Sequence, residues 1–141
     1  MKPLEGMRIL FADDSLYNMR PTREALELSG AFVATATDGT EVLQYFRDHT
    51  ADPPQLLILD IMMSGGPEIE TGEDGGRTTG VEVYRRLRKM GINIPIVIST
   101  VVSDPDILKE FQNDKVPILE KPYRYDELQR QIRKLTNRAE Q

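Results

Sequence analysis

The stretch Leu56-Leu57-Ile58-Leu59-Asp60 is an apolar run that ends in a carboxylate, and the same arrangement recurs along the chain. Similar runs end at four other polar side chains, those of Asp13, Asp14, Thr100 and Lys121. If the runs are parallel strands of one sheet, all five side chains lie at its carboxyl edge, where open α/β sheets bind ligands. Three carboxylates, one hydroxyl and one ammonium in one cleft suit a divalent cation and a phosphoryl group.

Short apolar runs alternate with amphipathic segments throughout the chain. The runs lie near residues 7–12, 31–36, 55–60, 94–100 and 116–119, and helical patterns lie near 15–29, 38–49, 80–90, 104–113 and 123–137. This alternation predicts an α/β fold with a five-stranded parallel sheet and helices on both faces. Pro117 cannot donate a hydrogen bond to a neighbouring strand, so the fifth run is predicted at an edge. A flavodoxin-like order, 2-1-3-4-5, satisfies this and places the most apolar runs in the centre.

The composition is that of a soluble globular protein. The 141 residues are 39% hydrophobic and 29% charged, and we expect residues 1–141 to form a single domain. The chain has no apolar stretch of the ~20 residues that span a bilayer and no secretory signal, so we expect a cytoplasmic protein without membrane insertion. The absence of cysteine excludes disulfides and thiolate zinc sites. A net charge of -5 argues against direct binding to nucleic acid.

Proline residues indicate where several helices begin. Asp104-Pro105 predicts an N-cap followed by proline at the first helical position, and Lys121-Pro122 predicts a similar start for the last helix. Pro21 falls inside the first helical pattern. Because proline lacks an N–H group, we expect either a kink there or a helix that starts only near residues 19–21.

Residues 64–79 interrupt the alternation of strands and helices. They are rich in glycine and acidic residues and nearly lack large apolar side chains. Because they bury too little surface to offset the entropy of ordering, we interpret them as an inserted mobile loop between the third strand and the third helix. The loop leaves directly from the cleft at Asp60, so a role in gating or in contacting a partner remains an alternative.

The acidic residues at the strand ends form a candidate Mg²⁺ site. Magnesium prefers oxygen ligands, usually one or two carboxylates with waters and phosphate oxygens. Asp13 and Asp14 are adjacent, so one can bind the ion while the other holds a coordinated water. Their alternative role is to cap a helix with Ser15, but Asp60 has no such role. Asp60 is instead the candidate nucleophile, since carboxylates can form acyl phosphates.

Lys121 and Thr100 can serve a phosphoryl group at Asp60. Transfer to a carboxylate requires the phosphoryl oxygens to be neutralised and aligned. Lys121 can supply a positive charge and Thr100 a hydroxyl donor. Taken singly, Lys121 is a surface lysine before a helix and Thr100 a residue that ends a strand. The functional interpretation depends on the combination of all the residue types at the strand ends.

With these motifs the chain resembles the receiver domain of bacterial two-component response regulators over essentially its whole length. The resemblance rests on Asp13-Asp14-Ser15, Asp60 after Leu-Leu-Ile-Leu, Ser99-Thr100 and Glu120-Lys121-Pro122-Tyr123. It implies that Asp60 is the phosphoacceptor and that the donor is a phosphohistidine on a sensor histidine kinase or phosphotransfer protein. Thr100 would be the switch hydroxyl that moves toward the phosphoryl oxygen, and Lys121 would be the ion-pair partner.

The resemblance also implies a set of metal ligands. Asp14, Asp60 and the backbone carbonyl of Met62 would bind Mg²⁺, with Asp13 acting largely through water. Such a domain catalyses its own phosphorylation and dephosphorylation and is not a classical multi-turnover enzyme.

Three positions depart from the family pattern. Met-Pro and a short loop usually follow the acceptor strand, whereas here Met63 is followed by Ser64 and the insertion. Val101 replaces a small residue after the switch hydroxyl, which predicts crowding at the phosphate and either slower hydrolysis or slower access of small phosphodonors. Ile118 replaces the aromatic residue three positions before the lysine, so the usual allosteric readout is not expected in its ordinary form.

The leading hypothesis is a phosphorylation switch that alters contacts with a downstream protein through the region 104–137. The chain would be a stand-alone regulator or a domain of a longer protein. A phosphorylation-independent binding module of the same fold is the alternative. A phosphatase of the haloacid-dehalogenase type is a third hypothesis, although its nucleophile normally follows the first strand rather than the third. His49 lacks acidic partners, and we interpret it as a surface residue.

Overall fold

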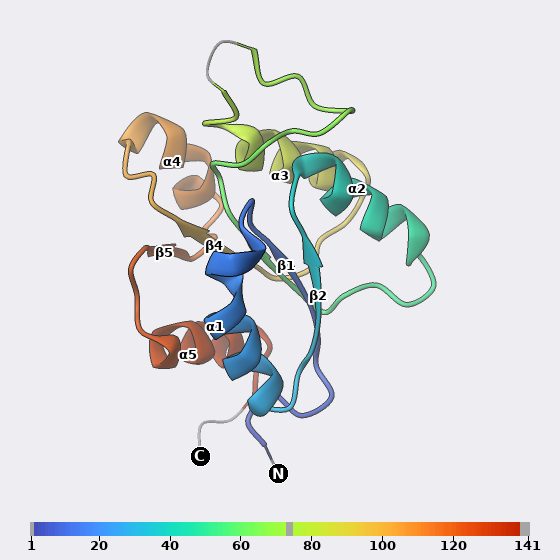
Figure 1. Cartoon of the computed structure of the whole chain (residues 1–141), viewed down its shortest axis with the longest axis vertical. Helices are drawn as coiled ribbons and strands as arrows, with labels where there is room; N and C mark the ends of the chain where they lie inside the picture. The colour runs from blue at the N-terminus through green and yellow to red at the C-terminus, as the bar shows by residue number, and fades with distance from the viewer. Residues whose placement is uncertain (1, 73–74, 139–141) are drawn as a thin grey trace.

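Five strands and five helices alternate along the computed structural model, which describes residues 2–72 and 75–138 (Figure 1). The strands are β1 (Arg8–Ala12), β2 (Phe32–Ala36), β3 (Leu56–Leu59), β4 (Ile96–Thr100) and β5 (Ile118–Glu120). The helices are α1 (Leu16–Leu28), α2 (Gly39–Asp48), α3 (Thr79–Lys89), α4 (Pro105–Asn113) and α5 (Tyr125–Leu135). The predicted alternation of strands and helices is confirmed.

The sheet has the predicted flavodoxin-like topology. All four strand pairs are parallel, and the order is β2-β1-β3-β4-β5. The central strand β3 is buried along its whole length, which explains why its run is apolar without interruption. Pro117 directly precedes β5, and its carbonyl accepts the Ile98 N–H at 2.9 Å. The edge position predicted from Pro117 is therefore confirmed.

Two hydrophobic layers cover the sheet, one on each face. On one face α2, α3 and α4 contribute buried residues such as Phe46, Leu87 and Phe111. On the other face α1 and α5 contribute Leu26 and Ile132. Figure 1 shows the same separation of the helices. Among the residues that the structure describes, none of the helices has the length and apolar character of a membrane span.

The first helix begins at Leu16, before the late start near residues 19–21 that is one of the two predictions for Pro21. The Ser15 hydroxyl accepts the Asn18 N–H at 3.1 Å and caps the helix, so that α1 begins at Leu16. Pro21 lies inside α1. The late start near residues 19–21 is therefore wrong, because the cap at Ser15 fixes the first turn before the proline is reached.

The other two starts marked by proline have different outcomes. Asp104 caps α4 through its carboxylate, as predicted from Asp104-Pro105. In contrast, α5 begins at Tyr125 and not at Pro122. The residue after Pro122 is not helical, and the Tyr123 hydroxyl forms a hydrogen bond with Ser99 on β4 instead.

The insertion between β3 and α3 is attached to α2. The Thr40 hydroxyl donates to the Gly65 carbonyl and accepts the Glu68 N–H, both at 2.8 Å. The Glu68 carboxylate is paired with Arg47 at 2.6 and 2.8 Å. Ile69, the large apolar residue of the insertion, is only 4% exposed and belongs to the hydrophobic layer. These contacts hold the first part of the insertion, and the mobility expected for the insertion as a whole stays a prediction.

Candidate functional site

Backbone hydrogen bonds hold three site residues just beyond the ends of their strands. The Asp13 N–H donates to the last residue of β2 at 3.1 Å, and the Asp60 N–H donates to the last residue of β1 at 3.0 Å. The Lys121 N–H donates to the last residue of β4 at 2.7 Å. Because these strands are parallel, the three side chains meet at the carboxyl edge of the sheet.

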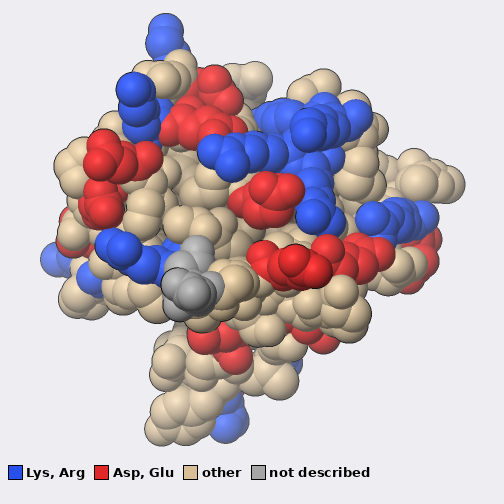
Figure 2. Space-filling view, turned by 90° about the horizontal axis from the view of Figure 1, so that it is seen from above, with Lys and Arg blue, Asp and Glu red and all other residues tan. Residues whose placement is uncertain are grey.

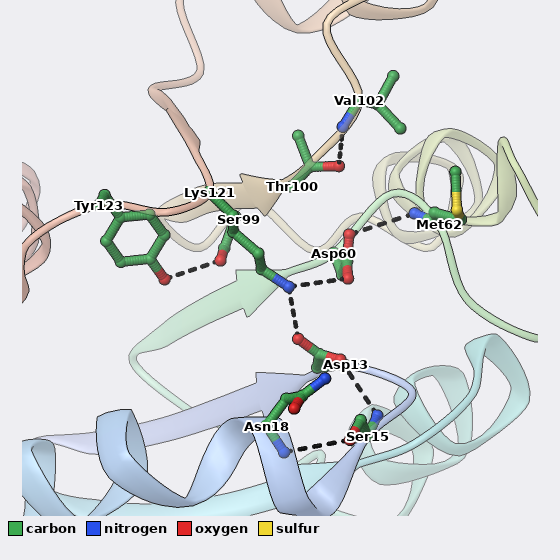
Figure 3. A network of polar contacts seen from close by, with 10 residues as sticks. All are labelled: Asp13, Ser15, Asn18, Asp60, Met62, Ser99, Thr100, Val102, Lys121 and Tyr123. Atoms are coloured by element: carbon green, nitrogen blue, oxygen red, sulfur yellow. Dashed lines mark hydrogen bonds and ion pairs between the residues drawn. The ribbon is translucent and has the colours of Figure 1, made fainter.

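The Lys121 ammonium lies between two carboxylates (Figure 3). It is 2.6 Å from Oδ2 of Asp13 and 3.1 Å from Oδ2 of Asp60. The other oxygen of each carboxylate accepts a backbone N–H, from Ser15 at 3.1 Å for Asp13 and from Met62 at 3.2 Å for Asp60. Both carboxylates are thus held in one orientation by a charge on one side and an amide on the other.

Asp14 completes an acidic cluster. One carboxylate oxygen from each of Asp13, Asp14 and Asp60 lies within 4.8 Å of the others, and Asp14 is the exposed member. With all three ionised, three carboxylates and the Lys121 ammonium leave a net charge of two negatives. The cluster lines a cavity of about 440 Å³. Clustered oxygen donors with this excess charge fit a divalent cation such as Mg²⁺.

Burial, and then the neighbouring charges, shift the pKa values of Asp60, Asp14 and Lys121. Burial raises the pKa of Asp60 above its ordinary value, the Asp13 charge adds to the rise, and Lys121 and the Met62 N–H offset it only in part. Burial also raises the pKa of Asp14, together with a hydrogen bond and the charge of Asp13. Burial lowers the pKa of Lys121, but the bonds to and charges of its two carboxylate partners outweigh burial and raise it. A bound cation would relieve the repulsion among the carboxylates.

Asp60→Asn is expected to stabilise the metal-free protein at neutral pH. Because the folded-state pKa of Asp60 is raised, its ionisation destabilises the fold as the pH rises through that pKa. Removing the carboxylate should therefore raise the free energy of unfolding by about 1 kcal/mol at neutral pH. The gain should vanish below the unfolded-state pKa of 3.8, where the group is neutral in both states. Urea unfolding with a chelator across this pH range measures the difference, and a more stable wild type at neutral pH would contradict it.

Thr100 ends β4 near the carboxylates, but its hydroxyl is bonded elsewhere. The side chain is fully buried, and the hydroxyl accepts the Val102 N–H at 3.1 Å (Figure 3). The wall of the cavity next to it is formed by Ser99 and Val101. Met62 is also part of the wall and is 39% exposed. The structure thus brings the acidic residues and the lysine together, whereas the Thr100 hydroxyl is bonded to the Val102 N–H.

Four further polar residues line the cavity without a role assigned from the sequence. Asn18 and Thr22 of α1 line it together with Asp14. The spacing of four residues between these three positions is a helical signal that could have identified them. Ser99 and Tyr123 also line the cavity, and their hydroxyl oxygens lie 2.7 Å apart. No pattern in the sequence pairs these two residues, because they come from different elements.

His49 lies at the C-terminal end of α2 and does not line the cavity. Its ring stacks on Tyr45 with 3.9 Å between ring centroids, and its Nδ1 lies 2.8 Å from the Tyr45 carbonyl oxygen. These contacts with Tyr45 explain the position of His49, and none of them requires a role in phosphotransfer.

Comparison with known proteins identifies the family of the chain. The family model described as response regulator receiver domain matches residues 9–133. The response regulator MprA of Mycobacterium leprae (strain TN) is 34% identical over 137 residues, which cover 94% of this chain and 52% of that protein. Its namesake from Mycobacterium tuberculosis (strain CDC 1551 / Oshkosh) is 32% identical over 138 residues, with 95% and 52% covered. The chain thus spans about half the length of the curated relatives it matches.

Solved structures share the fold at lower sequence identity. The Francisella response regulator 1452 receiver domain matches with a TM-score of 0.74 at 24% identity, over 96% of this chain and 100% of that chain. A chain of the CheX-CheY-BeF3-Mg+2 complex from Borrelia burgdorferi matches with a TM-score of 0.77 at 16% identity, over 96% and 98%. These likenesses show the fold, and the family model and the curated relatives show the family. The chain belongs to the response regulator receiver domains of two-component systems.

Proposed function

We propose that Asp60 accepts a phosphoryl group from a phosphohistidine on a sensor histidine kinase or phosphotransfer protein. An Asp60 oxygen attacks phosphorus and forms a P–O bond, while the P–N bond of the donor breaks and its electron pair stays on the ring nitrogen. The observation that carries the proposal is the Lys121 ammonium, held 3.1 Å from Asp60 and 2.6 Å from Asp13. A cation fixed beside the nucleophile stabilises negative charge on the phosphoryl oxygens during transfer.

The acidic cluster would hold Mg²⁺ for this reaction. Asp14, Asp60 and the Met62 carbonyl are the proposed ligands, with Asp13 acting largely through water. When bound, the ion supplies further positive charge to the phosphoryl oxygens. A protein of the same fold from Borrelia burgdorferi is known in a complex that contains BeF3 and Mg+2, which supports this assignment.

Magnesium is expected to stabilise the folded protein through the cluster. At a Mg²⁺ concentration about 100 times Kd, the free energy of unfolding should rise by about 2.7 kcal/mol. Asp13→Asn should lose most of this rise because it removes one of the clustered carboxylates. Asp106→Asn is the matched control, since Asp106 is exposed in the first turn of α4 and does not line the cavity. Urea unfolding measures the effect, and an equal rise in both variants would contradict the proposed site.

Phosphorylation would act as a switch on protein contacts. The added charge and acceptor oxygens would draw the Thr100 hydroxyl away from Val102 and toward the phosphoryl group. Thr100 leads directly into the region 104–137, which contains α4, β5 and α5. We infer that this region is the readout face and that its partner is a downstream protein.

The surface charge supports a protein partner rather than nucleic acid. The net charge of the chain is -5. Figure 2 shows acidic and basic side chains interspersed over the face seen from above, rather than a continuous cationic surface. Several of the arginines are paired with acids, such as Arg47 with Glu68 at 2.6 Å and Arg85 with Glu110 at 2.8 Å. Phosphate binding along a duplex requires a cationic face instead.

The acceptor function is tested by incubating the protein with Mg²⁺ and either acetyl phosphate or a phosphohistidine kinase. A gain in intact mass of one phosphoryl group supports the proposal. Absence of any gain with both donors would reject it and would favour a binding module that works without phosphorylation.

A further inference from the structure

The hydroxyls of Ser99 and Tyr123 form a hydrogen bond in the wall of the Asp60 cavity. They lie 2.7 Å apart, and either can be the donor. Ser99 is only 1% exposed, so its hydroxyl relies largely on this partner for a hydrogen bond. In the view of Figure 3 the Lys121 ammonium lies between the pair and Asp60.

Besides the pairing of β5 with β4, two hydrogen bonds attach the segment around Lys121 to the end of β4. The first joins the Lys121 N–H to the Thr100 carbonyl at 2.7 Å. The second joins Tyr123, two residues further along, to Ser99, the residue before Thr100. A lysine side chain is long and flexible, so a fixed backbone limits the positions that its ammonium can reach. The two bonds, together with the pairing of β5 and β4, fix the backbone from which Lys121 reaches the carboxylates.

We propose that Tyr123 is a positioning residue, which through its bond to Ser99 keeps the Lys121 ammonium between Asp13 and Asp60 for phosphoryl transfer. The inference rests on the proposed acceptor function. The ammonium is 2.6 Å and 3.1 Å from its two partners, and a displacement of about 1 Å would break at least one of these bonds. Displacements of about 1 Å at a reacting centre can slow a reaction by about 100-fold.

The effect of the Tyr123 hydroxyl can be tested separately from the packing of the Tyr123 ring. Tyr123→Phe keeps the ring and removes only the atom that bonds Ser99. The chain also offers a matched control, because the Tyr125 hydroxyl is likewise 2.7 Å from a serine hydroxyl, that of Ser29. This second bond joins α5 to the end of α1, and neither residue lines the cavity. Tyr125→Phe therefore removes the same atom and an equally short bond at a different place.

The test measures the rate constant for phosphorylation of Asp60 by acetyl phosphate with Mg²⁺. Tyr123→Phe and Ser99→Ala should each slow the reaction by about tenfold. The double variant should be no slower than either single variant, because both changes break the same bond. Tyr125→Phe should react at the wild-type rate even though it loses a comparable hydrogen bond. A Tyr123→Phe protein that is phosphorylated as fast as wild type would overturn the inference.

A double-mutant cycle of Tyr123→Phe with Lys121→Met distinguishes a positioning role of Tyr123 from direct action on the phosphoryl group. In a Lys121→Met protein, Tyr123→Phe should slow the reaction no further, because the group it positions is gone. The same slowing in both backgrounds would overturn the inference, since Tyr123 would then act without Lys121.

Amide hydrogen exchange separates this inference from the proposed function. Exchange of the Lys121 N–H should be about tenfold faster in Tyr123→Phe than in wild type, and unchanged in Tyr125→Phe. If wild type takes up no phosphoryl group, the acceptor function fails, while exchange at Lys121 still decides whether Tyr123 positions it. If the Lys121 N–H exchanges in Tyr123→Phe at the same rate as in wild type, that result alone would overturn the positioning role of Tyr123.

Discussion

Asp60→Asn is expected to abolish uptake of a phosphoryl group, whereas the wild type gains one from acetyl phosphate with Mg²⁺. The amide side chain is neutral and a poor nucleophile, so the acyl phosphate cannot form. The fold should be retained, because asparagine has nearly the shape of aspartate and its oxygen can still accept the Met62 N–H. Intact-mass spectrometry measures the uptake, and urea unfolding confirms that the variant is folded.

The control for this prediction is again Asp106→Asn, which removes a carboxylate outside the cavity. It should be phosphorylated like the wild type. Wild-type uptake by Asp60→Asn would show that another residue is the acceptor. Asp13 would then be the first alternative, since it is bonded to the same Lys121 ammonium.

Gly80→Ala is expected to destabilise the protein by about 3 kcal/mol and to weaken Mg²⁺ binding. Gly80 is in the first turn of α3, which packs against the backbone that follows β3. Its N–H donates to the Ile61 carbonyl at 2.8 Å. A methyl group at this position would overlap the Asp60 carbonyl oxygen and would lie 2.6 Å from the Ile61 Cα. Because both obstacles are backbone atoms, either α3 or the segment that carries Asp60 and Met62 must move.

Gly91→Ala provides the comparison at the other end of α3. Gly91 has a φ of +80° and open space around the position of a Cβ, so its substitution strains the backbone without a steric clash. We expect a cost of about 1–2 kcal/mol and unchanged Mg²⁺ affinity. Thermal unfolding and magnesium titration of both variants measure the contrast. A Gly80→Ala protein as stable as wild type would show that α3 does not hold the acceptor segment in the way the structure indicates.

The strand order and the ends of the strands could be predicted because each depends on local sequence. The unbroken run 56–59 predicts a strand buried on both faces, and Pro117 predicts an edge. Since the side chain that follows each run then lies at a known edge of the sheet, the acidic cluster and Lys121 follow from the topology. In the structure one carboxylate oxygen from each of Asp13, Asp14 and Asp60 lies within 4.8 Å of the others, as that reasoning predicts.

Other features could not be predicted because they depend on contacts between distant elements. Ile69 appears in the sequence as one apolar residue among glycines and acids, yet it is buried in the hydrophobic layer. The bond between Ser99 and Tyr123 likewise requires the position of the loop after β5. The start of α1 is the opposite case, since the local cap at Ser15 sets it and Pro21 is accommodated inside the helix.

The chemical identity of the phosphorylated residue is the most direct test of the central claim. Borohydride reduces an aspartyl phosphate to homoserine and leaves phosphate esters of serine and threonine intact. After incubation with acetyl phosphate and Mg²⁺, reduction and peptide mass mapping should place homoserine at position 60 and at no other aspartate. Homoserine at position 13 or 14, or a phosphoryl group found only on His49 or on a hydroxyl side chain, would contradict the assignment of Asp60 as the acceptor.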